Sequence, residues 1–531
     1  MVALGAGVLP ALLLPIASAS TASSSSSAPS GPSDWTVYHG KAAGTGVAAG
    51  ISSVDTSSPA WTSPALDGQV YGEPLVYSGK VYVATETDVV YALSATNGSI
   101  VWSTHVADPV PSHYLPCGDI DPYLGITGTP VIDPARRELF AVADEYIDDK
   151  PSHVLVGIDT ASGAIQMHQD VDPPGADPAA LLQRTGLNLD GGQVVFGMGG
   201  NYGDCASYRG RVVAAPESGG NPLFFSVDAA PSESQGAIWM GGGAPAVAGN
   251  GNIWVSTGNG SVHSPGGAYD DSDAALELSP TLRLIQFFAP SDWPENNAAD
   301  LDMSVVPVLL QNGEVLLAGK SRIVYLLDGA KLGGVGGQLA STGPVCDQDI
   351  DGGSAALGDV VYLPCTSGTV AVRASASPAS LKLLWSSGTG GGPPIVAAGL
   401  VWTIGSNGVL YGLNPSTGAV RQRADVGSVA NHFPTPSVGD GLLLAPTANG
   451  VVAFKATTPP TTTTTTSTTA STSTSSSSVT TSSSRPPASS PASSGHGGSA
   501  VGAAIGGIVA ALLLSALAAA VIFRRRARRV E

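Results

Sequence analysis

The sequence predicts an all-β protein whose main domain is an eight-bladed β-propeller of four-stranded antiparallel blades. Three observations predict this fold class: the composition, a segment that recurs eight times, and a proline that opens most of the recurring units. The chain has 531 residues, of which 43% are hydrophobic and 12% charged, with 68 Gly and 40 Pro. Such a composition supplies a large core but favours many turns over long helices.

The recurring segment is first seen as VVYALSATNG at residues 89–98. Comparable segments lie near Tyr91, Val156, Val213, Leu276, Tyr325, Ala371, Tyr411 and Val452, at spacings of 40 to 65 residues. Each unit also has an upstream alternating strand, such as VYVAT or LFAVA. Repeats of this length, with loop insertions, are typical of propeller blades. Eight units indicate eight blades, and seven blades are the alternative.

Most units open with a short Gly/Pro segment. These segments are Gly72-Glu73-Pro74, Gly128-Thr129-Pro130, Gly243-Ala244-Pro245, Val306-Pro307, Pro393-Pro394 and Thr435-Pro436. Proline is tolerated in a sheet at an edge strand, and the innermost strand of a blade is such an edge. The eighth unit ends at Lys455 without an outer strand, so we expect the segment around Trp61 to supply it and close the ring.

The two ends of the chain predict export and membrane anchoring. Residues 1–19 contain an uncharged Leu-rich run followed by Ala17-Ser18-Ala19, which indicates a signal peptide, and residues 20–33 form a disordered lead-in. The propeller is expected over residues 34–456, and residues 457–498 form a Ser/Thr/Pro-rich stalk. Residues 500–523 carry no charge and predict one transmembrane helix, with an Arg-rich tail at 524–531. The predicted location is the cell membrane, with a single pass, the propeller outside and the C-terminus cytoplasmic.

The charge balance narrows the class of partner. The formal net charge is −18, and five of the 23 basic residues lie in the last eight positions. The acidic body argues against nucleic acid. The expected partners are an extracellular protein, a glycan or a cation, besides the membrane at the C-terminal helix.

Several segments resemble the PQQ-like (quinoprotein-type) β-propeller repeat family. The repeat unit VYALSATNGSIVW and the opening DWTVYHGKAAGTG carry the general likeness. The segments CGDIDPYLGITGTPVID, FFAPSDWPENNAADLDMS and GKSRIVYLLDGAKLGGVGGQ resemble secreted, membrane-anchored bacterial members. The resemblance implies the fold but not the chemistry, because the family includes both quinone-dependent dehydrogenases and scaffolding propellers.

The four cysteines are expected on one face of the propeller. Strands alternate in direction, so the loops into each first strand and the loops between second and third strands share this face. The even count in an exported protein predicts two disulfides, and the topology favours Cys117–Cys205 and Cys346–Cys365. Zinc binding is the alternative, but no CxxC motif supports it.

Acidic side chains are expected on the same face. The predicted ligand face consists of Asp119, Asp121, Asp204, Asp292, Trp293, Asp300, Asp302, Asp347, Asp349 and Asp351, with Asp270, Asp271 and Asp273 nearby. Clustered carboxylates suit calcium or a cationic ligand. The alternative is a set of solvated loops in which Asp caps turns, and no metal ligand is assigned.

Three functions are compatible with these patterns. We favour a non-enzymatic binding or scaffolding platform that works through the acidic, disulfide-braced face.

The second is a PQQ- and calcium-dependent dehydrogenase. The resemblance implies for such enzymes a disulfide between adjacent cysteines, a tryptophan floor, and a calcium held by Glu, Asn and Asp beside a catalytic Asp. This chain has no adjacent cysteines, Trp293 is the one tryptophan expected in a loop of this face, and nothing fixes Asp300 or Asp302 beside a cofactor. The third is an envelope protein assembly factor. No catalytic or cofactor-binding residue is assigned.

Overall fold

The computed structural model describes residues 34–227, 234–431 and 433–457, which fall within one compact unit. The predicted signal peptide, lead-in, stalk, transmembrane helix and cytoplasmic tail therefore lie outside the described residues, apart from Thr457 at the start of the stalk. Within the described ranges, no helix is both long and apolar enough to cross a membrane.

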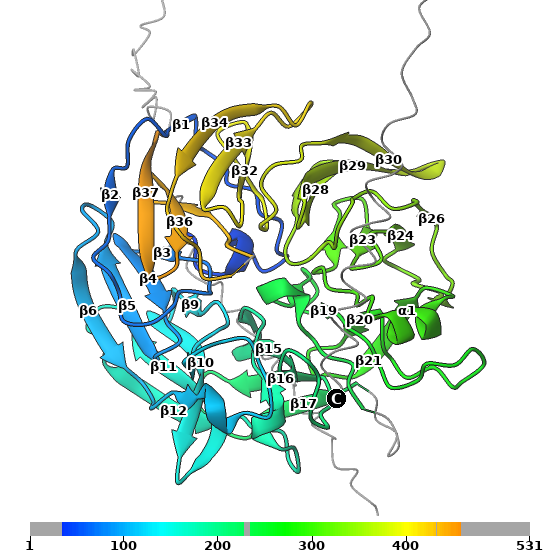
Figure 1. The fold of residues 1–531 in the computed structure, drawn as a ribbon, viewed down its shortest axis with the longest axis horizontal. Helices are drawn as coiled ribbons and strands as arrows, with labels where there is room; N and C mark the ends of the chain where they lie inside the picture. Colours follow the sequence, from blue (N-terminus) through cyan, green and yellow to red (C-terminus); the bar gives the residue numbers. More distant parts are fainter. Residues whose placement is uncertain (1–33, 228–233, 432, 458–531) are drawn as a thin grey trace, which may run out of the picture. The chain divides into compact units, whose positions relative to one another are not determined.

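Eight antiparallel sheets surround a central axis, as Figure 1 shows. Blade 1 contains β3 (Leu75–Tyr77), β4 (Lys80–Ala84), β5 (Val89–Ser94) and β6 (Ile100–His105). Blade 2 contains β9 (Val131–Asp133), β10 (Glu138–Ile147), β11 (Lys150–Asp159) and β12 (Ile165–Asp170). Blade 3 contains β14 (Asn188–Asp190), β15 (Gln193–Gly200), β16 (Arg211–Pro216) and β17 (Leu223–Ser226), and β13 (Leu181–Leu182) pairs with the end of β15. Blade 4 contains β18 (Ala246–Val247), β19 (Ile253–Ser256), β20 (Ala275–Leu278) and β21 (Leu284–Ala289), and β25 (Gly334–Val335) adds a parallel strand outside β21.

The remaining blades follow in chain order. Blade 5 contains β22 (Val308–Leu309), β23 (Glu314–Ala318), β24 (Val324–Asp328) and β26 (Ala340–Ser341). Blade 6 contains β27 (Ala355–Leu357), β28 (Val360–Cys365), β29 (Gly368–Ala376) and β30 (Ala379–Ser386). Blade 7 contains β31 (Ile395–Ala397), β32 (Leu400–Ile404), β33 (Val409–Leu413) and β34 (Val420–Asp425). Blade 8 contains β35 (Ser437–Gly439), β36 (Leu442–Thr447) and β37 (Gly450–Thr457), with β1 (Ser53–Asp55) and β2 (Trp61–Thr62) outside β37. The eight-bladed prediction is confirmed and the seven-bladed alternative is wrong.

The short elements that remain lie in connections. They are β7 (Val110–Pro111) and β8 (Tyr123–Leu124), the single-turn 3-10 helices η1 (Tyr38–Gly40), η2 (Ser112–Tyr114), η3 (Pro178–Ala180) and η4 (Met240–Gly242), and the helix α1 (Trp293–Ala299).

The sequence repeat corresponds to one strand of each blade. All eight recurring segments lie in the third strand, from β5 in blade 1 to β37 in blade 8. This strand is buried on both faces between neighbouring blades, which explains its near-continuous apolar run. The proline that opens a unit directly precedes the innermost strand, as at Pro74 before β3 and Pro436 before β35.

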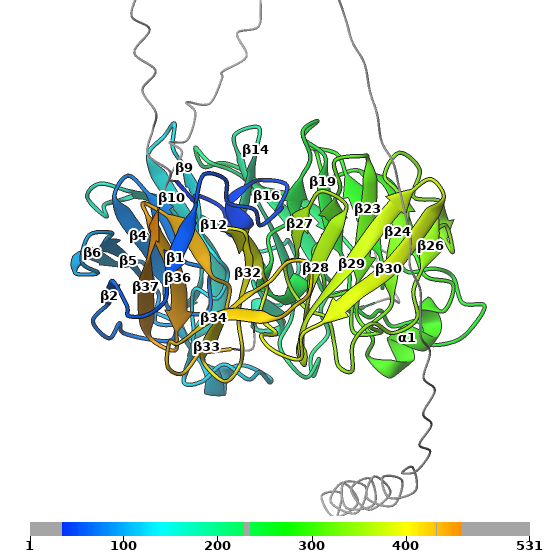
Figure 2. The same cartoon turned by 90° about the horizontal axis from the view of Figure 1, so that it is seen from above.

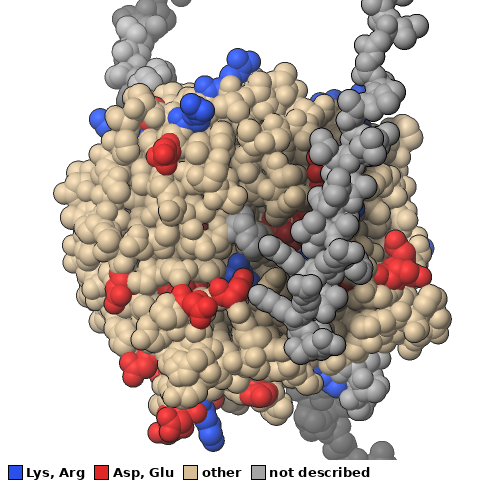
Figure 3. Space-filling view, viewed as in Figure 1, with Lys and Arg blue, Asp and Glu red and all other residues tan. Residues whose placement is uncertain are grey.

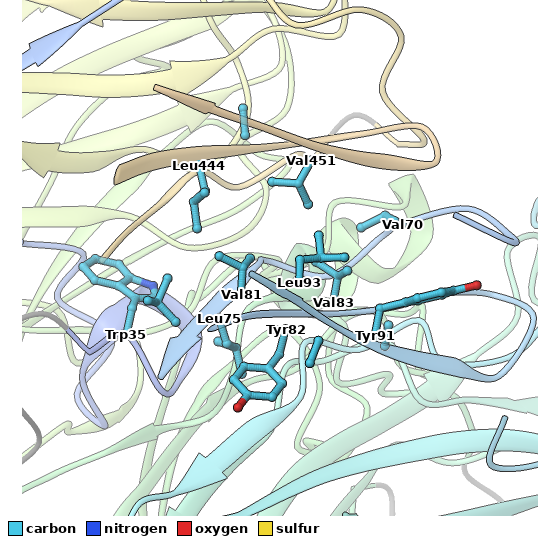
Figure 4. Close-up of a cluster of buried hydrophobic side chains, with 14 of the residues drawn as sticks. Trp35, Val70, Leu75, Val81, Tyr82, Val83, Tyr91, Leu93, Leu444 and Val451 are labelled. Carbon is cyan, nitrogen blue, oxygen red and sulfur yellow. The ribbon is translucent and has the colours of Figure 1, made fainter. Parts of the chain in front are cut away.

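The N-terminal segment closes the ring. Ser53 pairs with Thr457 and Trp61 with Ala453, so β1 and β2 complete the eighth blade from outside. Figure 4 shows the core behind this seam, where Leu444 and Val451 of blade 8 point toward Val81 and Leu93 of blade 1. All four side chains are buried.

Three outer-strand tryptophans pack against a glycine turn of the next blade: Trp61 on Gly98, Trp102 on Gly163 and Trp385 on Gly418. Each indole nitrogen donates a hydrogen bond to a backbone carbonyl beside that turn, at 2.9 to 3.3 Å. The glycines have φ between 69° and 76°, and a Cβ there would lie 2.5 to 2.7 Å from the indole. Glycine is therefore required at these turns both by backbone conformation and by contact.

The connections that enter the first strands and those between second and third strands emerge together, and we call their side of the ring the loop face. It is the side seen in Figure 1, and Figure 2 shows α1 on it. Both predicted disulfides are present there, Cys117–Cys205 between the loops of blades 2 and 3 and Cys346–Cys365 within blade 6.

Candidate functional site

Side chains from blades 4 and 5 and from the connections that enter them converge on Lys320 at the loop face. Its Nζ lies 3.1 Å from Asp300 Oδ1 and 2.5 Å from Asp302 Oδ2. The same ammonium group lies 5.5 Å from the ring centre of Trp239. Asn259 joins them, because its backbone N–H donates to Asp302 Oδ1 at 2.7 Å and its Nδ2 to Asp300 Oδ1 at 2.7 Å. We call these five residues the Lys320 cluster.

Connections between strands position every member of the cluster. Trp239 immediately precedes η4 in the connection to blade 4, and Asn259 follows β19. Asp300 ends α1 in a left-handed conformation, φ 57°. Lys320 follows β23.

Two glycines let Asp302 lie close to the backbone. A Cβ on Gly258 would lie 2.4 Å from Asp302 Oδ1, and one on Gly319 would lie 2.2 Å from the Asp302 backbone oxygen. These glycines directly precede Asn259 and Lys320 in the sequence. Gly258 and Gly319 are therefore both needed for the cluster to assemble.

Acidic groups outnumber the single lysine around the cluster. Burial alone would lower the pKa of Lys320, but the nearby Asp302 and Asp300 carboxylates raise it above its usual range. Burial raises the pKa of Asp351 to about 6, and burial together with Asp302 raises that of Asp273 well above its ordinary value. Burial also raises the pKa of Asp204, which interacts electrostatically with Asp302, Asp300 and Lys320. The surroundings therefore favour an additional proton or positive charge.

Several buried polar atoms beside the cluster have no hydrogen-bond partner among the described residues. They include Trp239 Nε1 and Asn259 Oδ1. Buried polar groups are nearly always satisfied in folded proteins, by protein, water or a ligand. Their concentration here marks the site as one that takes water or a ligand.

A metal ion is a poor match for the site. Among the residues that the structure describes, no three His, Cys, Asp or Glu side chains are grouped so as to hold one. Lys320 already pairs with the carboxylates of both Asp300 and Asp302. Calcium is therefore given no role.

The other predicted face residues lie apart from the cluster. Asp119 and Asp121 line a separate cavity of about 120 Å³ beside Cys117, with Leu182 and Asn201. Asp292, Asp347 and Asp349 are exposed, and Asp270 accepts hydrogen bonds from Ser272 and Val262. Figure 3 shows acidic side chains in several separate groups on the visible part of this face.

One tryptophan was expected in a loop of this face, whereas the structure places two there, Trp293 in α1 and Trp239 before η4. Trp293 is 5% exposed and packs edge-on against Tyr269, whereas Trp239 faces the cluster. Trp239, Asn259 and Lys320 were not predicted from the sequence. The signal that could have found them is a glycine directly before a polar residue at the end of a second strand, as in STGN and LAGK.

Comparisons with known proteins agree on the fold. The family model described as outer membrane protein assembly factor BamB matches residues 20–275. A quinohemoprotein alcohol dehydrogenase from Pseudomonas putida HK5 is 14% identical, with 80% of each chain covered and a TM-score of 0.60. One from Comamonas testosteroni is 16% identical, with 81% of this chain and 82% of that chain covered and a TM-score of 0.57. A europium-containing methanol dehydrogenase is 13% identical, with 80% of this chain and 98% of that chain covered and a TM-score of 0.60. No curated protein matches the sequence.

Proposed function

The chain is a β-propeller of the PQQ-like type, and we propose that it is a quinone-dependent dehydrogenase with its cofactor on Trp239 beside Lys320. The observation that carries this proposal is the Lys320 ammonium group, placed over the Trp239 indole and between two aspartates. An aromatic surface, a fixed cation and a carboxylate are what a planar quinone and its alcohol substrate require. This proposal replaces the platform function favoured from the sequence, because two of the predicted face acids, Asp300 and Asp302, are paired with Lys320.

The residues of the cluster fit a quinone in three respects. The Trp239 indole offers a face on which a planar ring system stacks. The Lys320 ammonium offers a strong donor to a quinone oxygen. The unpartnered Asn259 Oδ1 and Trp239 Nε1 offer an acceptor and a donor at the edge of the site. When bound, such a quinone supplies the two-electron acceptor that oxidation of an alcohol needs.

The two aspartates have different tasks in this proposal. Both oxygens of Asp302 are engaged, one by Asn259 and one by Lys320, and its side chain is 8% exposed, so it positions the lysine. Asp300 lies on the solvent side with a side chain 72% exposed. It is therefore the residue that can reach a substrate hydroxyl and accept its proton.

The chain departs from the family pattern at the disulfide. No adjacent cysteine pair is present, and Cys117–Cys205 instead ties the loop of Asp204 to the neighbouring blade. The proposal keeps the placement expected from the sequence, with the propeller outside a membrane that the chain spans once, so that reduced cofactor would be reoxidised by an extracellular acceptor.

Calorimetric titration of the full chain with pyrroloquinoline quinone, with and without calcium, tests the proposal. We expect micromolar or tighter binding to the wild type. Lys320→Ala removes a charge-assisted hydrogen bond, which is equivalent to about a 10- to 100-fold loss of affinity. The exposed Lys331→Ala is the matched control and should bind like the wild type.

Binding would then justify an assay of alcohol oxidation with an artificial electron acceptor. We expect Asp300→Asn to lower the rate while leaving quinone affinity within about twofold. Absence of heat under both calcium conditions would overturn the proposal and return the platform and assembly functions to first place, to be tested by capture of an extracellular partner.

A further inference from the structure

The cavity of about 120 Å³ beside Cys117 shares no lining residue with the Lys320 cluster. Two chain segments that are distant in the sequence form it, the connection between blades 1 and 2 that contains η2 and β8, and the loop after β15. The Cys117–Cys205 disulfide joins these segments, and the backbone N–H of Cys205 donates to Cys117 Sγ at 3.4 Å. The cavity is therefore held in shape by covalent structure.

The inner wall of the cavity is apolar. Ile120, Leu124 and Leu182 line it, none is more than 8% exposed, and all three belong to one small buried cluster. Because a cavity of roughly 150 Å³ holds benzene, one of about 120 Å³ has room for about five non-hydrogen atoms. The inner wall therefore suits a ligand with a short apolar chain.

The rim of the cavity is acidic. Asp119 and Asp121 are exposed residues that line it, and none of the described residues lining the cavity is a lysine, arginine or histidine. The Ser112 hydroxyl donates to Asp121 Oδ1, which leaves Oδ2 open to a ligand. Two carboxylates without a lining cation favour a ligand that carries a positive charge.

A buried amide in the wall is a second, independent indication of a ligand. Asn201 is 4% exposed and lines the cavity. Its Nδ2 donates to the Ala179 backbone oxygen at 2.9 Å, which fixes the orientation of the amide. Among the described residues, no donor reaches Asn201 Oδ1. Since buried polar groups are nearly always satisfied, this oxygen is an acceptor available to whatever enters the cavity.

We propose that the cavity binds a primary alkylammonium ion, with the alkyl chain on the apolar wall and the ammonium group at the acidic rim. An ammonium group has three N–H donors and no acceptor, which matches the two carboxylates and Asn201 Oδ1. The Tyr202 ring, which is 60% exposed and also lines the cavity, adds an aromatic face for the cation. The ammonium group has two sources, a free amine or a lysine side chain of an extracellular protein. Neither source depends on the proposed quinone.

The test is a calorimetric titration of the full chain with three probes. They are n-butylammonium, methylammonium, which has the charge without the chain, and N-acetyl-lysine methylamide, which presents the lysine side chain on a capped backbone. One variant combines Asp119→Asn with Asp121→Asn, and a second is Tyr202→Ala. The matched control combines Asp347→Asn with Asp349→Asn, two exposed acids beside the other disulfide, and changes the net charge equally.

We expect n-butylammonium to bind the wild type with a Kd of about 0.1–1 mM, as suits a ligand of this size. Methylammonium should bind about tenfold or more weakly, because it loses the contact with the apolar wall. The Asp119 and Asp121 double variant should lose about tenfold or more, Tyr202→Ala about two- to fivefold, and the control nothing. If the source is a lysine side chain, the capped lysine binds as well as n-butylammonium. If the source is a free amine, the capped lysine binds at least tenfold more weakly.

The proposal is overturned if the wild type does not bind n-butylammonium at millimolar concentration. It is also overturned if the Asp119 and Asp121 double variant binds like the wild type, or if the control loses as much affinity, because the effect is then one of net charge alone. An unchanged unfolding midpoint shows that each variant is folded. The comparison of n-butylammonium with methylammonium needs only the wild type, and equal affinities would contradict a role for the apolar wall.

Discussion

Glu86 is a buried carboxyl at the turn between β4 and β5, and it determines part of the pH dependence of stability. Its Oε2 accepts from the Gly125 backbone at 2.9 Å and from the Thr127 hydroxyl at 3.1 Å, while Oε1 has no partner among the described residues. Burial raises its pKa to about 8 in the folded state. The folded protein therefore favours the protonated acid, so stability is fully present below the unfolded pKa of about 4.5 and is lost as the pH rises toward 8.

We predict that Glu86→Gln reduces the loss of folding stability that the wild type shows as the pH rises. The amide oxygen accepts the same two hydrogen bonds and never ionises, so the variant should gain up to a few kcal/mol over the wild type above pH 8. The two proteins should be nearly equal near pH 4.5. Guanidinium unfolding at a series of pH values measures the difference, with the exposed Glu295→Gln as control. A constant offset between Glu86→Gln and wild type at every pH would contradict the prediction.

At the scale of single residues, the sequence predicted the acids better than their partners. Asp300 and Asp302 were expected on the loop face and belong to the cluster. Trp239 and Lys320 were not foreseen, because they lie about 80 residues apart and are brought together by the ring, which local periodicity does not describe.

At the scale of elements, the third strand of each blade was the most predictable part of the fold. It is buried on both sides, so its apolar run is long enough to be recognised in all eight units. The inner strands are two or three residues long, and the sequence marks only those that follow a proline, which β14 and β27 do not. The extra parallel strand β25 had no sequence signal, because two residues carry no periodicity.

The two disulfides should contribute unequally to stability. Cys117 and Cys205 are separated by 88 residues and Cys346 and Cys365 by 19. Loop-closure entropy grows with the logarithm of this separation, so the longer loop should contribute about 1.4 kcal/mol more to the free energy of unfolding.

Two double variants test this difference, Cys117→Ser with Cys205→Ser, and Cys346→Ser with Cys365→Ser. Each removes one bridge without leaving a free thiol. Guanidinium unfolding should give a lower free energy of unfolding for the variant without Cys117–Cys205 than for the variant without Cys346–Cys365. The reverse order would show that native contacts, and not loop length, set the contribution.

At the scale of the whole molecule, the closure of the ring was foreseen from one missing strand. Trp61 is 7% exposed in the closing segment, and its indole hydrogen-bonds Ala95 of blade 1. Trp102 makes the same kind of contact between blades 1 and 2, within the uninterrupted chain. Comparing a variant of Trp61 with the same variant of Trp102 therefore separates the effect of losing a packed indole from the effect of opening the ring.

We predict that Trp61→Ala costs about 3–5 kcal/mol through lost burial, and that Trp102→Ala costs less because its side chain is partly exposed. Only Trp61→Ala should also speed hydrogen exchange along β37. The reason is that β1 and β2 pair with the outer edge of β37, and the Trp61 indole ties this segment to blade 1. Mass-spectrometric exchange of peptides from residues 442–457 measures this. Equal protection of β37 in both variants would mean that β1 alone keeps the seam closed.

The pairing of the two distant chain segments at the seam also determines when the last blade can be completed during biosynthesis. The hydroxyl of Ser52 donates to the backbone oxygen of Thr457, 405 residues later in the chain. At roughly 5–20 residues per second, a ribosome needs about 20–80 s to pass from one partner to the other. For all of that time the outer strand of the last blade has been made and has nothing to pair with. Among the described strands, β1 is thus the first to be made and the last to pair, so until then both its unpaired edge and the edges of the growing, incomplete ring are exposed on the nascent chain.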